Sequence, residues 1–237
     1  MNVIRLADTI SFHSYLPNTY ITQPYAFYNW SNQSAIIWKH NKSYNYQKLN
    51  GIQRPFIIEY VNNADAIITK ITDAIKFYTE AFRYDENNNE MVSANLITFN
   101  KAVLYNSRQC SGLLELRVKD QHLTNDYLQQ QVSDTRNTIQ LDRNEKDWSF
   151  NSFRDIRTDY NQAIWSKNTN TIGEYIDKTL NTKSINVNKP WTDLEPFRDK
   201  YLIVRFIFDN FDSQTNKHGI YKLLVNYFIN TDKASIR

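Results

Sequence analysis

The stretch YLIVRFIF, from Tyr201 to Phe208, decides the fold class that we expect for this chain. A strand with one solvent-facing side alternates between apolar and polar side chains. This stretch is apolar on both faces, with a single arginine in the middle. At strand period, the two faces carry Leu202, Val204, Phe206 and Phe208 on one side and Tyr201, Ile203, Arg205 and Ile207 on the other. The pattern predicts a strand in a sheet that is covered on both faces.

Arg205 interrupts this apolar run, and two interpretations of it are open. In the first, the side chain snorkels to the surface or pairs with a carboxylate across a terminal hairpin. In the second, it reaches a neighbouring subunit, because buried arginines at interfaces form bidentate pairs. We prefer the first interpretation.

The length, cysteine count, net charge and apolar runs of the sequence exclude several classes of protein. The 237 residues are enough for one large all-β domain or two small domains. One cysteine, Cys110, excludes an internal disulfide, so the chain carries no sign of an oxidising compartment. The net charge of +3 is too balanced to predict nucleic-acid binding. The opening MNVIRLADTI lacks the apolar segment of a signal peptide, and no apolar run is long enough to span a membrane.

The aromatic content favours a sheet protein with large interfaces. Aromatic residues make up 14% of the chain, which has 16 tyrosines but only 4 glycines. Tyrosine and tryptophan in quantity are typical of half-buried sheets and of protein interfaces. Asparagine is frequent and can replace glycine at left-handed turn positions. A biased, AT-rich coding sequence would explain the same composition equally well.

The order of short apolar runs and turns predicts a mainly β fold, with antiparallel sheets that are sandwich-like or barrel-like, a few short helices and long loops. We expect a β domain over residues 1–119, a polar connector over 120–147 and a smaller β domain over 148–237. The smaller domain would hold a short helix near Phe153 and end in a long hairpin over 198–230. The strands expected in the first domain are 9–16, 19–30, 34–40, 53–61, 101–109 and 111–119.

The segment from Asn63 to Phe82 is ambiguous. Its apolar residues follow helical spacing, which fits an amphipathic helix. Isoleucine and threonine are dense, however, and the following DENNNE (85–90) looks like the tip of a hairpin. Composition alone does not decide between helix and strand.

No motif in the sequence predicts a catalytic, cofactor or metal site. DENNNE begins like a calcium loop, but Glu90 stands where glycine is needed and Leu96 where glutamate is needed. The four histidines have no metal-ligand spacing, and Cys110 would need a histidine partner to act as a nucleophile. Four glycines cannot build a phosphate loop. We therefore expect no enzyme, no cofactor and no metal. The histidines are His13, His40, His122 and His218.

Several segments, taken in order, carry a resemblance to a known family. They are FHSYLPNTYI (12–21), the IIWKHN…YN connector (36–45), RPFIIEYVNN (54–63), TKITDAIKFYTE (69–80), LYNSRQCSGLLEL (104–116), DWSFNSFRDI (147–156), FRDKYLIVRFIFDN (197–210) and KLLVNYF (222–228). This series resembles the C-terminal part of the muzzle proteins of crAss-like bacteriophages. Those are large tail proteins, also called stabilisation proteins, and are similar in role to the tail hubs of other podoviruses.

The resemblance implies a structural virion protein without catalysis, made in the host cytoplasm, in a ring that closes the tail tip and forms the DNA ejection path. The implied partners are further copies of the chain, the rest of the muzzle polypeptide, neighbouring ring proteins, and DNA that passes without specific binding. In the family, the segment 69–80 runs as strand, so we expect strand here. Family members are several times longer, so we expect another polypeptide to complete the first strands.

Two other functions stay open. A carbohydrate-binding or glycan-processing domain would need two or three exposed, coplanar tryptophan rings. A DNA-contacting adaptor ring would need basic side chains that converge on one surface. The tryptophans available for sugar stacking are Trp30, Trp38, Trp148, Trp165 and Trp191.

Overall fold

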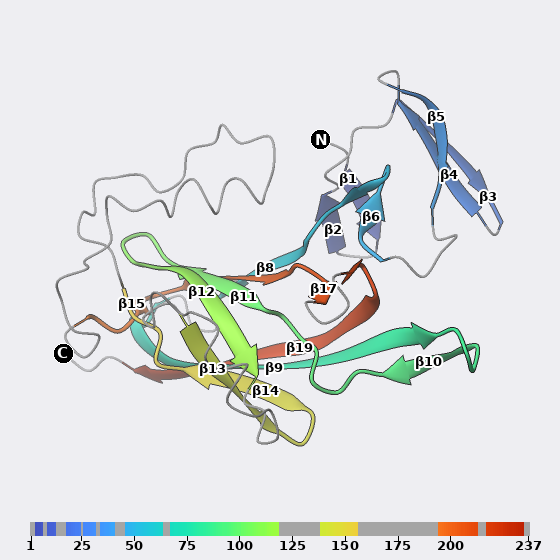
Figure 1. Ribbon diagram of the computed structural model, residues 1–237. Coiled ribbons are helices and arrows are strands. Elements are labelled where there is room, and N and C mark those ends of the chain that lie inside the picture. Colours follow the sequence, from blue (N-terminus) through green and yellow to red (C-terminus); the bar gives the residue numbers. More distant parts are fainter. Residues whose placement is uncertain are drawn as a thin grey trace.

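The computed structural model describes residues 3–6, 9–12, 18–24, 26–31, 34–40, 46–63, 67–118, 138–155, 194–212 and 217–234, and within them the chain is built from strands (Figure 1). The predicted mainly β fold is confirmed, while the described residues contain no helix. In particular, they hold no helix long and apolar enough to cross a membrane. The described residues 152–155 that follow β14 (Asp147–Asn151) are irregular, so Phe153 itself is not helical, and the rest of the segment in which a short helix is expected falls outside the described residues.

The strands have the following bounds in chain order. They are β1 (Val3–Leu6), β2 (Thr9–Phe12), β3 (Thr19–Gln23), β4 (Ala26–Ser31), β5 (Ser34–Lys39), β6 (Lys48–Leu49), β7 (Ile52–Gln53), β8 (Phe56–Asn62), β9 (Lys70–Asp85), β10 (Glu90–Ser93), β11 (Lys101–Tyr105), β12 (Cys110–Val118), β13 (Thr138–Asn144), β14 (Asp147–Asn151), β15 (Arg198–Asp199), β16 (Leu202–Phe208), β17 (Phe211–Asp212), β18 (Lys217–His218) and β19 (Tyr221–Ala234).

Ten of these strands form one large sheet (Figure 1). Its order is β10-β9-β14-β13-β12-β11-β16-β8, and β15 and β19 also pair with β9. All pairs are antiparallel except β12 with β13, so the sheet is mixed rather than purely antiparallel. The sheet curls, because the ring of Tyr60 on β8 stacks on the ring of Phe228 on β19 at 4.5 Å although the two strands lie at different ends of the sheet order.

An aromatic core fills the concave face of this sheet. Phe206 on β16 lies at its centre and is fully buried. The ring of Phe206 lies 4.8 Å from those of Phe77 and Phe99 and 5.4 Å from that of Phe228. These rings come from β9, β16, β19 and the segment before β11, so side chains distant in sequence close the core together.

The other face of β16 is only partly buried, since Ile203 and Arg205 are intermediate in exposure and the apolar side chains beside them come from neighbouring strands of the same sheet. The cover predicted for both faces is therefore confirmed for the core face alone. Ile207 is 4% exposed and joins Val103 and Cys110 in a second buried apolar cluster. Arg205 Nε donates to Glu59 Oε2 at 2.5 Å, and the Tyr105 hydroxyl donates to the same oxygen at 3.0 Å. Arg205 therefore pairs with a carboxylate of its own chain, but the predicted position across the terminal hairpin is wrong, because Glu59 lies on β8.

The predicted terminal hairpin over 198–230 is wrong. Its two long strands do not pair with each other: β16 lies between β11 and β8, and β19 runs along β9. Only the short strands β17 and β18 form a hairpin in this segment. Adjacency in sequence suggested the pairing, but the side-chain pattern of a strand does not specify which strands lie along its edges. The large sheet also combines strands from the expected 1–119 and 148–237 domains.

β9 settles the ambiguous segment in favour of strand, as the family resemblance implies. Residues 75, 77, 79 and 81 are buried and alternate with less buried neighbours, which is strand period. The helical stripe fails at its start, where Ile67 is 85% exposed. DENNNE indeed forms a hairpin tip, between β9 and β10.

The N-terminal strands form smaller sheets. β3, β4 and β5 make a three-stranded antiparallel sheet, while β1 pairs with β2 and β6 with β7. The β6–β7 turn packs on Trp38 of β5: a Cβ built on Gly51 would lie 2.8 Å from the Trp38 ring, and Gly51 has a φ of +80°. In the described residues, β1 to β5 form no pairs with the large sheet. Their completion by another polypeptide stays a prediction.

Candidate functional site

The residues considered for metal or nucleophilic chemistry lie apart. Cys110 is buried, and its backbone N–H donates to Asp155 Oδ1 at 3.0 Å. His40 packs against the ring of Phe27 at 5.0 Å, and His218 lies in β18. The described residues contain no group of three histidine, cysteine or acidic side chains that could hold a metal ion. His13 and His122 fall outside the described residues.

The described tryptophans do not form a shared platform. Trp148 is 1% exposed and belongs to the aromatic core. Trp30 lies opposite Ile37 and Trp38 lies opposite Asn29, so the two tryptophans point to different faces of the three-stranded sheet. Trp30 is 38% exposed, which leaves one open ring. Trp165 and Trp191 fall outside the described residues.

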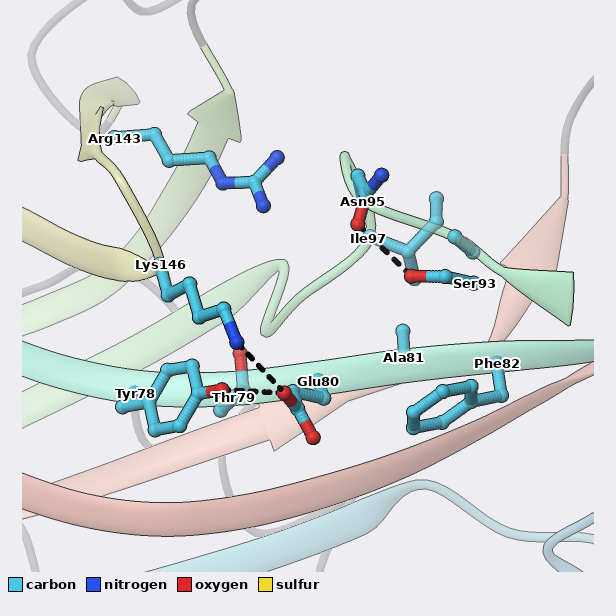
Figure 2. Close-up of a pocket in the computed structure, with 11 residues that line it drawn as sticks. Tyr78, Thr79, Glu80, Ala81, Phe82, Ser93, Asn95, Ile97, Arg143 and Lys146 are labelled. Carbon is cyan, nitrogen blue, oxygen red and sulfur yellow. Dashed lines mark hydrogen bonds and ion pairs between the residues drawn. The ribbon is translucent and has the colours of Figure 1, made fainter.

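A concave feature with several polar side chains lies along one edge of β9, and we call it the β9 notch (Figure 2). On this edge β9 pairs with β14 as far as Tyr78 and with β10 from Phe82 onward. Residues 79–81 between them have β19 as their only strand partner in the described sheet. The notch exists because β9 is 16 residues long while β14 and β10 have 5 and 4.

Three elements line the β9 notch, whose volume is about 240 Å³. Residues 78–82 of β9 form one side, and residues 93–97 after β10 form another. The β13–β14 hairpin contributes Arg143 and Lys146. Figure 2 shows the Lys146 ammonium directed at Glu80, while the Arg143 guanidinium extends into the space that faces Asn95.

A tyrosine and a lysine hold the single carboxylate of the notch. The Tyr78 hydroxyl donates to Glu80 Oε1, and Lys146 Nζ lies 4.0 Å from the same oxygen. The hydrogen bond to Glu80 is the main reason why the pKa of Tyr78 is raised above its ordinary value. Glu80 is therefore already satisfied by groups of its own chain.

Arg143 is positioned by an aromatic ring rather than by an acid. It lies directly opposite Trp148 on the neighbouring strand, and its guanidinium stands over the Trp148 ring at 5.1 Å. No ion pair of Arg143 occurs within the described residues. The five N–H donors of a guanidinium are therefore available at the mouth of the notch.

A second polar group ties three strands together beside the notch. Lys76 Nζ on β9 lies 2.5 Å from Asp147 Oδ2 on β14, and the Tyr227 hydroxyl on β19 donates to Asp147 Oδ1. Hydrogen bonds from Lys76 and then Tyr227 lower the pKa of Asp147, and the bond to Asp147 raises the pKa of Lys76. The same carboxylate raises the pKa of Tyr227.

These shifts decide what the two polar groups can do chemically. Each one moves a pKa away from neutrality, so Asp147 stays ionised, Lys76 stays charged and the tyrosines stay neutral. A general acid or base works best with a pKa near the operating pH. The arrangement is therefore suited to fixed hydrogen bonds and ion pairs, and the notch to binding.

The sequence interpretation did not identify these residues. Lys76, Tyr78 and Glu80 alternate with buried residues along β9, so a polar face could have been recognised once strand was assumed. Their partners Asp147 and Tyr227 lie about seventy and one hundred and fifty residues further along the chain. Nothing in a single sequence indicates that pairing.

Comparisons with known proteins add no family to this geometry. No protein-family model matches the chain. No curated protein matches it either.

Proposed function

We propose that this chain is a structural subunit of a multi-chain assembly and, on the resemblance of its segments to muzzle proteins, a component of the tail of a short-tailed bacteriophage. The observation that carries the proposal is the pair of incompletely paired strands in the large sheet. β8 pairs only with β16, and β19 pairs only with β9, among the described residues.

Unpaired strand edges attract other chains, so folded proteins usually shorten, charge or cover them. β19 has 14 residues and β8 has 7, so neither edge is short. Apolar side chains are also exposed along them: Val61 on β8 is 59% exposed, and Leu224 and Tyr227 on β19 are 39% and 41% exposed. Burial of such edges against neighbouring subunits would stabilise an assembly.

The charge of the chain suits a place beside a DNA path. Strong phosphate contacts would hold the DNA, because each neutralised phosphate adds to the binding free energy through counterion release. A net charge of +3 on 237 residues supplies little such attraction. The chain would then shape a conduit through which DNA moves without specific binding.

Two measurements test the proposal. Light scattering after size-exclusion chromatography of the full 237-residue chain should give a mass that is a multiple of the 28.2 kDa monomer. Quantitative mass spectrometry of purified virions should find the chain at a fixed copy number relative to other tail proteins. A monomer at every concentration that is also missing from virions would overturn the proposal, and a glycan screen that centres on Trp30 would then be the next step.

A further inference from the structure

We propose that the β9 notch binds a carboxylate side chain from the acidic β9–β10 turn of a second copy of this chain. The inference rests on the proposed function, since it describes one contact within the assembly. Arg143 is the main cation of the notch, and Glu86 and Glu90 of the second copy supply the carboxylates that bind there.

The notch has the donors and the room that a carboxylate needs. Arg143 has no acidic partner in the described residues, and its guanidinium stands over the Trp148 ring. Figure 2 shows the Arg143 guanidinium directed into the notch. The guanidinium fork matches a carboxylate, with which it forms charge-assisted bonds. The volume of about 240 Å³ equals that of about eight water molecules, which accommodates the end of a glutamate side chain.

The one carboxylate already in the notch does not prevent this binding. Glu80 accepts the hydroxyl of Tyr78 and lies 4.0 Å from the ammonium of Lys146. In Figure 2, Glu80 and Lys146 lie at one side of the notch, and Arg143 faces Asn95 across the remaining space. An incoming carboxylate therefore has a separate position in which a guanidinium and an amide face it.

Within the described part of the chain, the glutamates of the acidic turn have no basic partner. Glu90 lies directly opposite Asp85 in the β9–β10 pair, and Glu86 follows in the turn. Like charges opposite each other on neighbouring strands are destabilising. Asp85 is used by the turn itself, because its carboxylate accepts the backbone N–H of Asn87 and the amide of Asn88. Glu86 and Glu90 are exposed and make no ion pair within the described residues.

Geometry requires the turn and the notch to come from different copies. The notch lies where β10 ends at Ser93, and the turn lies at the other end of the same antiparallel pair. Register places Phe82 beside Ser93 and Asp85 beside Glu90, three residues further along. At strand rise this separation is about 10 Å, and a paired ladder cannot fold back on itself. The contact therefore joins two copies, either reciprocally in a twofold dimer or head-to-tail in a ring or filament.

A charge exchange in the full-length chain tests the contact. One variant carries Arg143→Glu, and the other carries Glu86→Lys with Glu90→Lys. Each variant alone faces like charge across the proposed contact, so sedimentation velocity should show association weakened by about tenfold or more. An equimolar mixture restores opposite charge at every contact and should recover association. Arg108→Glu, an exposed arginine on the β11–β12 turn, is the matched control and should associate like the wild type.

The outcomes separate this inference from the proposed function. Loss in each variant with recovery in the mixture supports the contact, provided that circular dichroism shows unchanged folding. The contact is overturned if either variant associates as strongly as the wild type, or if the mixture stays dissociated. In both cases the proposed function still stands, because the wild type forms an oligomer. A wild-type chain that is monomeric throughout overturns the contact, and it overturns the proposed function as well if the chain is also missing from virions.

Discussion

Replacement of Phe206 by alanine should remove the centre of the core and destabilise the chain strongly. The side chain is fully buried, and its ring contacts those of Phe77 and Phe99 at 4.8 Å and that of Phe228 at 5.4 Å. A phenylalanine truncated in a packed core reduces the free energy of unfolding by about 3–5 kcal/mol, from lost transfer energy and the cavity left behind. Three close aromatic partners place Phe206→Ala at the upper end, since each aromatic pair adds about 0.5–1.5 kcal/mol.

Urea titration followed by tryptophan fluorescence measures this change, because Trp148 lies in the same core and reports its opening. Phe211→Ala is the control, since it truncates the same residue type at a position that is 43% exposed. Its effect should stay below about 1 kcal/mol. If Phe206→Ala prevents folding altogether, Phe206→Leu should give a stable protein with an intermediate loss. Equal losses for Phe206→Ala and Phe211→Ala would refute the position of Phe206 at the centre of the core.

Three further predictions follow from the polar groups and one turn. Alanine substitutions at Arg205 and Glu59, alone and together, should show a coupling free energy of about 1 kcal/mol in urea titrations; a coupling near zero would contradict their ion pair. Because the pKa of Asp147 is lowered, its carboxylate stabilises the fold above its unfolded pKa, and this contribution is lost as pH falls through the lowered pKa. When pH is lowered below about 4, the melting temperature of the Asp147→Asn variant should therefore fall less than that of the wild type. If the melting temperatures of the two proteins fall in parallel, the predicted role of Asp147 is contradicted. Gly51→Ala should destabilise the β6–β7 turn by about 1 kcal/mol and move the Trp38 ring, with a changed native fluorescence spectrum as its readout; an unchanged spectrum and stability would contradict that packing.

The sequence was most informative where one strand carries its own pattern. β16 is apolar on both faces: the aromatic core covers one, and on the other Ile207 lies in a smaller cluster made by neighbouring strands of the same sheet. β9 alternates over a long stretch, yet its isoleucines also match helical spacing, so the family resemblance was needed to choose. These signals are local, because the spacing of apolar residues within one segment is enough to show its period.

Strand pairing was much less predictable, because it depends on segments that are far apart in the chain. β16 and β19 are neighbours in sequence with a turn between them, which is the ordinary signal of a hairpin. Instead, β16 lies between β11 and β8, and β19 runs along the 16-residue strand β9. The polar group around Asp147 has the same non-local origin, since Lys76 and Tyr227 reach it from two other strands.

The β9 notch is a consequence of unequal strand lengths. β19 follows β9 over nearly its whole length on one edge, whereas β14 and β10 cover only the two parts on either side of residues 79–81. A sheet built on such a long strand must either extend one of the short neighbours or leave a gap. Here the β13–β14 turn ends the cover on one side and places Arg143 and Lys146 at the gap, while the segment after β10 closes the other side. The interruption in the sheet thus brings two cations to a concave site, and the acidic end of the same β9–β10 hairpin offers the complementary charge at a distance that only another copy can bridge.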